Sequence, residues 1–417
     1  MKVLLFAGAG TSIELGVPGM VGMGEEFLDH AKQWDVEPAL VQKLIGDSLD
    51  VEHLIEALDR ICTARPTLEA IGQVSVPLDR ADKIRAEVEW FVQHAAERVV
   101  AGDARLMWGP VLRAASSLDL TLVTTNYDRA IELAANAENV PIDDGFEPFG
   151  KGETASWAGF SQNSDRPLLA KLHGSTDWYA AGEFGSPTKL RHPMPLFGRA
   201  SLRLADGKEL GSALVLPSRE KLLTHSPYPR LSQTFLNAAD CCDVAIFVGS
   251  SLRDHHIRGA AEATARRVPV FVVNPSGDTY ALENVRAIKQ CASTFLIATL
   301  PHDLIATDPV AALASITTEA NDDRGVLVAV RQALDGDTAV DIRCRALERL
   351  DEIGITLDPF LLRQLLADHD ATVARYALGL ISLSADRLKL IEVAAATPHA
   401  SEPAFRDDLQ LLREMLQ

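Results

Sequence analysis

Residues 1–18, MKVLLFAGAGTSIELGVP, contain the stretch that decides the fold. Residues 3–7 form a short apolar run typical of a buried strand, and Gly8, Gly10 and Ser12 lead from it into a helix-like stretch. A strand that passes through glycines into a helix is how α/β proteins build a backbone cradle for phosphate groups. Glycine allows close approach to an anion, and the first helical turn offers unpaired N–H groups. The stretch therefore predicts a central strand that ends either at a phosphate site or at a merely tight turn.

Composition and charge narrow the class of protein. The chain has 417 residues, of which 47% are hydrophobic, so we expect two or three domains with sizeable cores. The net charge of −18 argues against binding of nucleic acid or of an anionic membrane, because phosphate binding depends on clustered Lys and Arg. The apolar run of residues 3–7 is too short for a signal peptide or a membrane span.

Cysteine usage points to a reducing compartment. The five cysteines form no C-x-x-C pair, so the sequence suggests neither a disulfide framework nor a zinc ribbon. We therefore expect a cytoplasmic protein without zinc.

Residues 21–110 have the pattern of a helical insertion. Apolar residues recur there at helical spacing, and strand-like alternation is missing. The expected helices cover Glu25–Ala31, Pro38–Ile45, Val51–Ile61 and Ile84–Val100. We expect this insertion to pack and to make oligomer contacts rather than to take a direct part in catalysis.

Polar or small residues follow each later strand of the expected sheet. The residues that follow the strands are Asn126 and Asp128, then His173, then Gly249 and Ser250, and finally Asn274. They cover residues 120–124, 168–172, 244–248 and 268–273, with a short strand at 213–216 and loops at 139–166 and 179–212. Open parallel sheets place their ligands at the carboxyl ends of the strands. The fold class is therefore α/β, with a Rossmann-like parallel sheet in residues 1–300.

Residues 301–417 read as an all-α domain. Two stretches resemble each other about 32 residues apart, 330–347 and 362–378, as in a pair of HEAT-like helical hairpins. Such a domain serves assembly or partner docking, or it simply caps apolar surface of the core.

Five motifs in order resemble the sirtuin family. They are GAGTSIELGVP, TTNYD, KLHGS, GSSL and VNPSG, and they cover residues 1–20 and 111–300. Sirtuins bind NAD on a Rossmann-like sheet and break its nicotinamide–ribose bond. The resemblance implies that His173 is the catalytic histidine and that Asn126 and Asp128 lie near the nicotinamide riboside. It further implies that the NAD phosphates and riboses are contacted by Gly8, Ala9, Gly10, Ser12, Gly249, Ser250 and Asn274.

Two departures from the deacylase members limit the resemblance. Val17 and Pro18 run into Gly19–Met20–Val21 instead of the Asp-Phe-Arg loop that closes on NAD, and the C-x-x-C zinc ligands are missing. The chain is therefore more similar to the divergent sirtuin-like domains of bacterial antiphage systems. That resemblance implies NAD hydrolysis to ADP-ribose and nicotinamide, gated by homo-oligomerisation or by a partner such as a HerA-like hexameric ATPase.

The same residues suit this chemistry without reference to a family. Departure of nicotinamide gives the ribose oxocarbenium character, so the site needs groups that orient the ribose and a base that activates water. His173 suits the base because its ordinary pKa of about 6.5 lies near neutral pH, and the Asn126 amide can orient the ribose or the water. Asp128 either binds the carboxamide, stabilises positive charge, or only caps the next helix. The adjacent His255 and His256 point apart on a helix, which favours a solvated face over a metal site.

Alternative functions remain open at this point. One is an NAD-dependent protein deacylase or ADP-ribosyltransferase, which releases product only when an acceptor is supplied. Another is a non-catalytic sensor that binds NAD or ADP-ribose without turnover.

Overall fold

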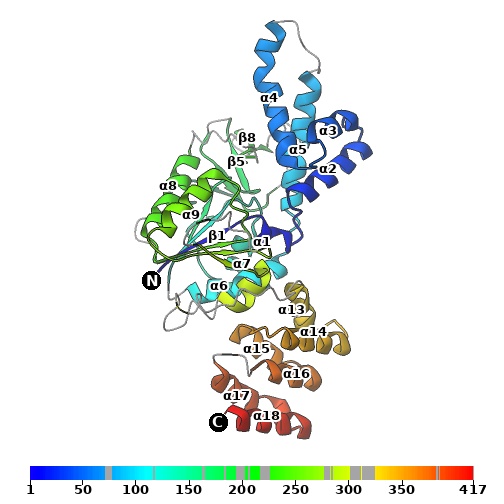
Figure 1. Ribbon diagram of the computed structural model, residues 1–417, viewed down its shortest axis with the longest axis vertical. Helices are drawn as coiled ribbons and strands as arrows, with labels where there is room; N and C mark the ends of the chain where they lie inside the picture. The colour runs from blue at the N-terminus through cyan, green and yellow to red at the C-terminus, as the bar shows by residue number, and fades with distance from the viewer. Residues whose placement is uncertain are drawn as a thin grey trace. The chain divides into compact units, whose positions relative to one another are not determined.

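Figure 1 shows the computed structural model along the chain. The chain divides into two compact units. Unit 1 comprises Met1–Val99, Asp119–Arg129 and Pro141–Val268, and unit 2 comprises Val100–Leu118, Ala130–Val140 and Pro269–Gln417. The structure describes residues 1–70, 78–115, 118–161, 165–182, 185–193, 202–204, 207–216, 226–276, 282, 285–300, 311, 325–381, 384 and 386–416. The expected boundary after residue 300 adjoins residues outside these ranges.

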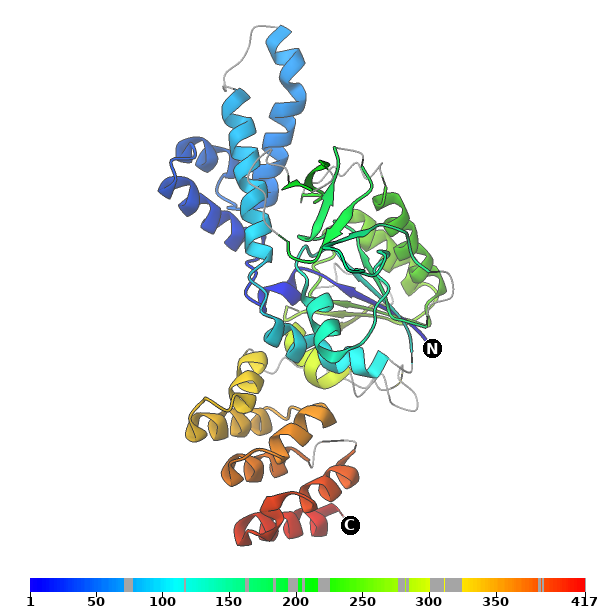
Figure 2. The ribbon, with the colours of Figure 1, turned by 180° about the vertical axis from the view of Figure 1, so that it is seen from behind.

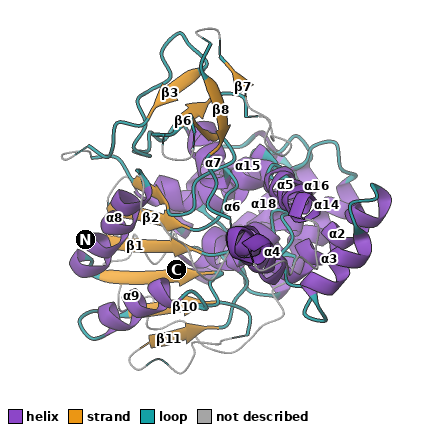
Figure 3. Ribbon diagram, turned by 90° about the horizontal axis from the view of Figure 1, so that it is seen from above, coloured by secondary structure: helices purple, strands orange, loops and turns teal. Residues whose placement is uncertain are grey.

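A parallel sheet forms the centre of the fold, as the sequence predicts. Its strand order is β11-β10-β9-β1-β2-β4, and β1 with β2, β1 with β9, β2 with β4 and β10 with β11 all pair in parallel (Figure 3). Unit 1 contributes β1 (Lys2–Ala7), β2 (Asp119–Thr124), β4 (Leu168–Lys171) and β9 (Val244–Val248), and unit 2 contributes β10 (Val270–Val273) and β11 (Val285–Ile288). Strand β9 is buried along its whole length, as its continuous apolar sequence predicts.

A second, antiparallel sheet is a feature that the sequence interpretation missed. Its order is β3-β6-β5-β8-β7, and its strands are only two to four residues long. They are β3 (Thr154–Ser156), β5 (Trp178–Ala180), β6 (Thr188–Leu190), β7 (Leu202–Arg203) and β8 (Glu209–Ser212). The expectation of loops here was wrong because strands this short show no readable alternation. The strand expected at residues 213–216 is also absent, since β8 ends just before it.

Residues 21–110 are helical, as predicted: four helices of unit 1 cover most of this range, and its last residues belong to α6 (Ala101–Ala114) of unit 2. The four helices are α2 (Met20–Gln33), α3 (Pro38–Ile45), α4 (Val51–Ala70) and α5 (Leu78–Ala96), and α4 and α5 run side by side (Figure 2). Their apolar faces form one core, whose fully buried members include Phe27, Val41 and Leu54. The same core includes Tyr127, which follows β2, and Leu216. The insertion therefore packs on segments that adjoin the carboxyl edge of the sheet.

Two further helices of unit 1 flank β9 in the sequence. They are α8 (Tyr228–Cys241) and α9 (His255–Ala265). The Asp254 carboxylate caps α9 by accepting a hydrogen bond from the His256 N–H at 2.9 Å. His255 and His256 are both exposed, which agrees with a solvated face.

The helices of unit 2 end in an array of three helical hairpins. The unit also contains α6 (Ala101–Ala114), α7 (Ala130–Glu138), the short α10 (Ala292–Thr294) and a π-helical turn at Phe295–Thr299. The hairpins are α13 (Val326–Leu334) with α14 (Val340–Glu352), α15 (Pro359–Leu366) with α16 (Ala371–Ile381), and α17 (Arg387–Ala395) with α18 (Pro403–Leu416). Helix α14 contacts α16, and α16 contacts α18. The sequence predicted two such hairpins, and the third satisfies the usual minimum for a stacked array.

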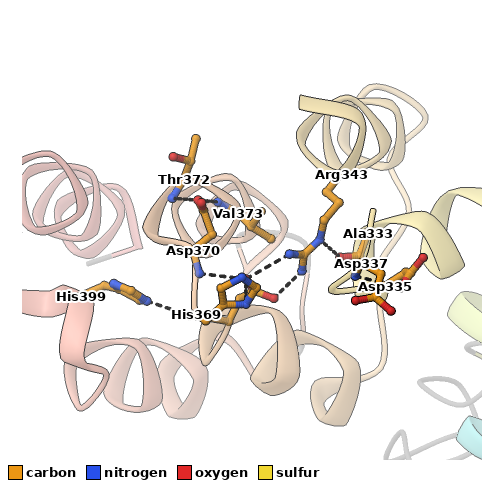
Figure 4. A network of polar contacts seen from close by, with 10 residues as sticks. Ala333, Asp335, Asp337, Arg343, His369, Asp370, Thr372, Val373 and His399 are labelled. Atoms are coloured by element: carbon orange, nitrogen blue, oxygen red, sulfur yellow. Dashed lines mark hydrogen bonds and ion pairs between the residues drawn. The ribbon is translucent and has the colours of Figure 1, made fainter. Parts of the chain in front are cut away.

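A buried polar network connects the three hairpins (Figure 4). Arg343 of α14, which is 1% exposed, donates hydrogen bonds to both carboxylate oxygens of Asp368 and to the Ala333 carbonyl. The imidazole of His399 lies 2.7 Å from the Asp368 carbonyl and 2.7 Å from a Glu402 oxygen. Burial raises the pKa of Asp368, but the hydrogen bonds from Arg343 and from the Asp370 N–H, together with the charge of Arg343, hold this pKa below its usual range.

Candidate functional site

The register of the sheet brings four of the expected site segments to one edge. Ala7 lies opposite both Thr124 and Val248, and Thr124 lies opposite Lys171. Because these strands are parallel, the residues that follow them emerge at the same edge and level. Asn126 is the second residue after Thr124, and His173 is the second after Lys171, so they occupy equivalent positions after neighbouring strands.

The two glycine turns, after β1 and β9, pack directly on each other. The Gly8 N–H donates to the Val248 carbonyl and the Gly10 N–H to the Gly249 carbonyl, both at 2.8 Å. A Cβ atom on Gly8 or Gly10 would lie 2.7 Å from backbone atoms of the second turn. Gly249 has a φ of +62°, and its Cβ would lie 2.6 Å from the Thr11 nitrogen. Close backbone approach therefore explains all three glycines, independently of any ligand.

The helix that follows the first turn differs from the expectation. It is the single turn α1 (Gly10–Ile13), and the N–H groups of Thr11 and Ser12 donate to the Gly8 and Ala9 carbonyls at 3.0 Å. These N–H groups are therefore not available to a phosphate. The sequence interpretation, which expected unpaired N–H groups in the first helical turn, was wrong for these two residues. Instead, within unit 1 no described residue accepts a hydrogen bond from the N–H groups of Ala9, Gly249 and Ser250. These three donors come from both turns, and they are the candidates for binding an anion.

The orientation of the Asn126 side chain is fixed by the first turn. Its amide nitrogen donates to the Gly8 carbonyl at 3.0 Å and to the Thr11 hydroxyl at 2.9 Å. The backbone N–H of Asn126 donates to the Thr124 hydroxyl at 2.9 Å. Both amide hydrogens are thereby used, and no described residue donates to the carbonyl oxygen of the side chain. Asn126 thus presents an oriented acceptor at the edge of the sheet.

Asp128 and Ser12 form a buried pair next to this turn. The Ser12 hydroxyl donates to the Asp128 carboxylate at 2.5 Å, and the two side chains are 5% and 6% exposed. The Nζ of Lys171, which is 1% exposed, donates to the backbone carbonyl of Asp128. The structure therefore ties Ser12 to the end of β2. The roles of Ser12 and Asp128 toward a nucleotide remain predictions.

His173 is buried at the end of β4, with 7% of its surface exposed. Its ring centre lies 6.3 Å from that of Tyr127, and its carbonyl accepts a hydrogen bond from the Val215 N–H at 3.0 Å. Asn274 follows β10 in unit 2, where its side-chain oxygen accepts a hydrogen bond from the Ser276 hydroxyl at 2.8 Å. Its role as a nucleotide ligand also remains a prediction.

Sequence reasoning overlooked two residues of the site. The Thr11 hydroxyl donates to the Gly8 carbonyl at 2.8 Å and accepts from Asn126, so it joins the turn to the amide. Lys171 is the only charged residue of β4, and a charge inside an apolar strand was a visible signal of a buried polar role. Among the described residues, no group of three or more His, Cys, Asp or Glu side chains could hold a metal ion. No helix in the described part of the chain is long and apolar enough to cross a membrane.

The fold and the placement of these loops define an α/β protein whose candidate site lies at the carboxyl edge of a parallel sheet. The family model of the SIR2-like domain matches residues 120–282, which include Asn126, Asp128, His173, Gly249, Ser250 and Asn274. This part of the chain is therefore sirtuin-like, whereas β1 and its turn lie outside the match. None of the curated proteins matches the chain.

Solved structures of Sir2 homologues resemble the chain more distantly. A Sir2 homologue in complex with NAD has 14% sequence identity and a TM-score of 0.42, over 76% of this chain and 91% of that one. A mutant Sir2 homologue in complex with 2′-O-acetyl ADP ribose has 14% identity and a TM-score of 0.40, over 76% and 94%. Because the sequence identity and the TM-scores are low, these structures assign no role to any residue of this chain.

Proposed function

We propose that the chain is an NAD hydrolase that cleaves the nicotinamide–ribose bond to give ADP-ribose and nicotinamide. The observation that carries the proposal is the juxtaposition of three kinds of group at one sheet edge. Ala9, Gly249 and Ser250 offer N–H donors that have no acceptor in unit 1, Asn126 presents an oriented acceptor, and His173 follows the neighbouring strand at the equivalent level. The SIR2-like match over residues 120–282 supports the same reaction class.

The residues suit the proposed reaction in distinct ways. Backbone N–H groups from two packed turns bind phosphate oxygens without a cationic side chain. The free carbonyl oxygen of Asn126 accepts a hydrogen bond from a ribose hydroxyl or from the attacking water. His173 takes the proton of that water as it attacks the anomeric carbon, while the glycosidic bond breaks and nicotinamide leaves as a neutral molecule.

The wider setting of the proposal comes from the sequence resemblance. We place the protein in the cytoplasm, in bacterial antiviral defence, with NAD depletion as the outcome. Uncontrolled hydrolysis of NAD is toxic, so activity is gated by homo-oligomerisation or by a partner such as a HerA-like ATPase. The described hairpins α13–α18 offer surface for such assembly.

A transferase is the second candidate. A protein deacylase or ADP-ribosyltransferase uses the same leaving group, and the buried His173 favours it in one respect, because restricted access of water favours another acceptor. A sensor that binds NAD or ADP-ribose without turnover needs only the N–H donors.

Chromatography of the products from NAD tests the proposal. Wild-type protein, assayed with and without a HerA-like ATPase, is expected to release nicotinamide and ADP-ribose in equal amounts, at a rate that does not depend on added acyl-peptide. His173→Ala and Asn126→Ala are expected to lose at least about 100-fold in rate, while His255→Ala, on the exposed start of α9, is the matched control that keeps it. Release that requires an acceptor supports the transferase, and full activity in both site variants contradicts the site.

A further inference from the structure

A short segment connects His173 to the core of the helical insertion. This connecting segment, residues 213–216, follows β8 and runs past the loop that carries the histidine. The Val215 N–H donates to the His173 carbonyl at 3.0 Å, and the Ala213 N–H donates to the Trp178 carbonyl at 3.1 Å. The connecting segment is thus bonded to the backbone of His173 and to the first residue of β5.

Two buried tyrosines bind backbone carbonyl groups of the connecting segment. The Tyr127 hydroxyl donates to the Val215 carbonyl at 2.7 Å, and the Tyr228 hydroxyl donates to the Ala213 carbonyl. Burial raises the pKa of both phenols above the usual value, so both stay protonated and able to donate at neutral pH. Val215 is therefore held from both sides, by His173 through its N–H and by Tyr127 through its carbonyl.

The two leucine side chains of the connecting segment pack in the core of the helical insertion. Leu216 is 6% exposed within the core built by α2–α5, and the partly buried Leu214 packs against the same core. Tyr127 is itself a member of this core, with 8% exposure. A continuous path therefore runs from the insertion core through Leu214 and Leu216 to the Val215 peptide, and from there to His173.

We propose that the helical insertion positions His173 through this connecting segment, and that Tyr127 is a positioning residue for the histidine. Tyr127 acts twice, because its ring lies beside the imidazole and its hydroxyl binds the carbonyl of Val215, the residue whose N–H donates to the histidine carbonyl. The insertion, which the sequence assigns to packing and oligomer contact, thereby sets the geometry of the proposed base. This inference rests on the proposed function for its kinetic consequence, but not for its structural one.

Two substitutions with a matched control test the proposal kinetically. Tyr127→Phe keeps the ring and removes the hydroxyl that donates to Val215. Leu214→Ala loosens the connecting segment, and Leu44→Ala removes an equally partly buried leucine from the same core, away from that segment. We expect Tyr127→Phe and Leu214→Ala to lower kcat for nicotinamide release about tenfold, since small misplacements of a reacting group are costly. KM for NAD is expected to stay within about twofold in all three variants.

An activity-independent measurement separates this inference from the proposed function. Spectra of protein with 15N-labelled histidine, in which His173→Gln assigns the signal, report the environment of the imidazole. Tyr127→Phe and Leu214→Ala are expected to shift the His173 signals, and Leu44→Ala to leave them unchanged. A wild type that does not hydrolyse NAD at any protein concentration, with or without a HerA-like ATPase, refutes the proposed function, while the spectra still test the positioning. Unshifted His173 signals, or an equal loss of kcat in Leu214→Ala and Leu44→Ala, overturn the inference.

Discussion

Replacing Gly249 by alanine tests whether the contact between the two glycine turns organises the site. Two costs add at this position. A residue with a side chain at positive φ costs about 1–2 kcal/mol, and φ is +62° here. The new Cβ would also lie 2.6 Å from the Thr11 nitrogen and 2.8 Å from the Gly10 carbonyl carbon. Both atoms are backbone, so relief requires the first turn to move, at a further cost of about 1–3 kcal/mol.

Two other glycines of unit 1 provide controls. Gly16→Ala carries only the cost of the positive φ, and Gly259→Ala carries neither cost. Gly16 has a φ of +91°, and a Cβ atom added there would meet nothing within 4 Å, so Gly16→Ala is expected to lose only about 1–2 kcal/mol. Gly259 lies in α9 with open space around it, and Gly259→Ala is expected to gain about 0.5–1 kcal/mol. Gly249→Ala is expected to lose about 2–5 kcal/mol in total, a large part of the stability of an ordinary domain.

Urea unfolding followed by circular dichroism measures these differences, and a titration with NAD measures the site. The expected order of stability is Gly259→Ala, wild type, Gly16→Ala and then Gly249→Ala. Only Gly249→Ala is expected to weaken NAD binding, because only that variant displaces the N–H donors of the two turns. If Gly249→Ala unfolds at the same urea concentration as Gly16→Ala, the close contact of the turns does not hold and the reasoning is refuted.

The network of the helical hairpins yields the remaining predictions. Asp368→Asn leaves the buried Arg343 without its carboxylate and is expected to destabilise the protein by about 3–5 kcal/mol in urea unfolding. Asp341→Asn, which removes a carboxylate from an exposed ion pair, is expected to change stability by less than about 1 kcal/mol. Similar losses in the two variants would contradict the importance of the buried pair. Hydrogen bonding to Glu402 raises the pKa of His399, so this histidine stabilises the fold below its unfolded pKa of about 6.5, and the stabilisation disappears as pH rises through the folded pKa. The stability difference between wild type and His399→Ala is therefore expected to be larger at pH 6 than at pH 9, and a difference that grows with pH would contradict it.

Much of the fold follows from local patterns in the sequence. Pro38–Ile45 and Val244–Val248 are a helix and a strand with the predicted bounds, because apolar periodicity and flanking breakers act over a few residues. The short strands of the antiparallel sheet have no such signal, since two to four residues pair only where the chain brings distant partners together. For the same reason, the sequence did not reveal that the helical insertion reaches His173 through the connecting segment.

The sequence by itself determined the parallel sheet, the helical insertion, the helical C-terminal part and the set of candidate residues at the strand ends. Only the tertiary structure decided which groups of those residues are free. It pairs the N–H groups of Thr11 and Ser12, whereas no described residue of unit 1 accepts a hydrogen bond from those of Ala9, Gly249 and Ser250. It also orients Asn126 through contacts with Gly8 and Thr11, more than 100 residues earlier in the chain. Strand propensity is a local property, but the register of parallel strands and the hydrogen bonds between their loops depend on partners far apart in sequence, which no local pattern encodes.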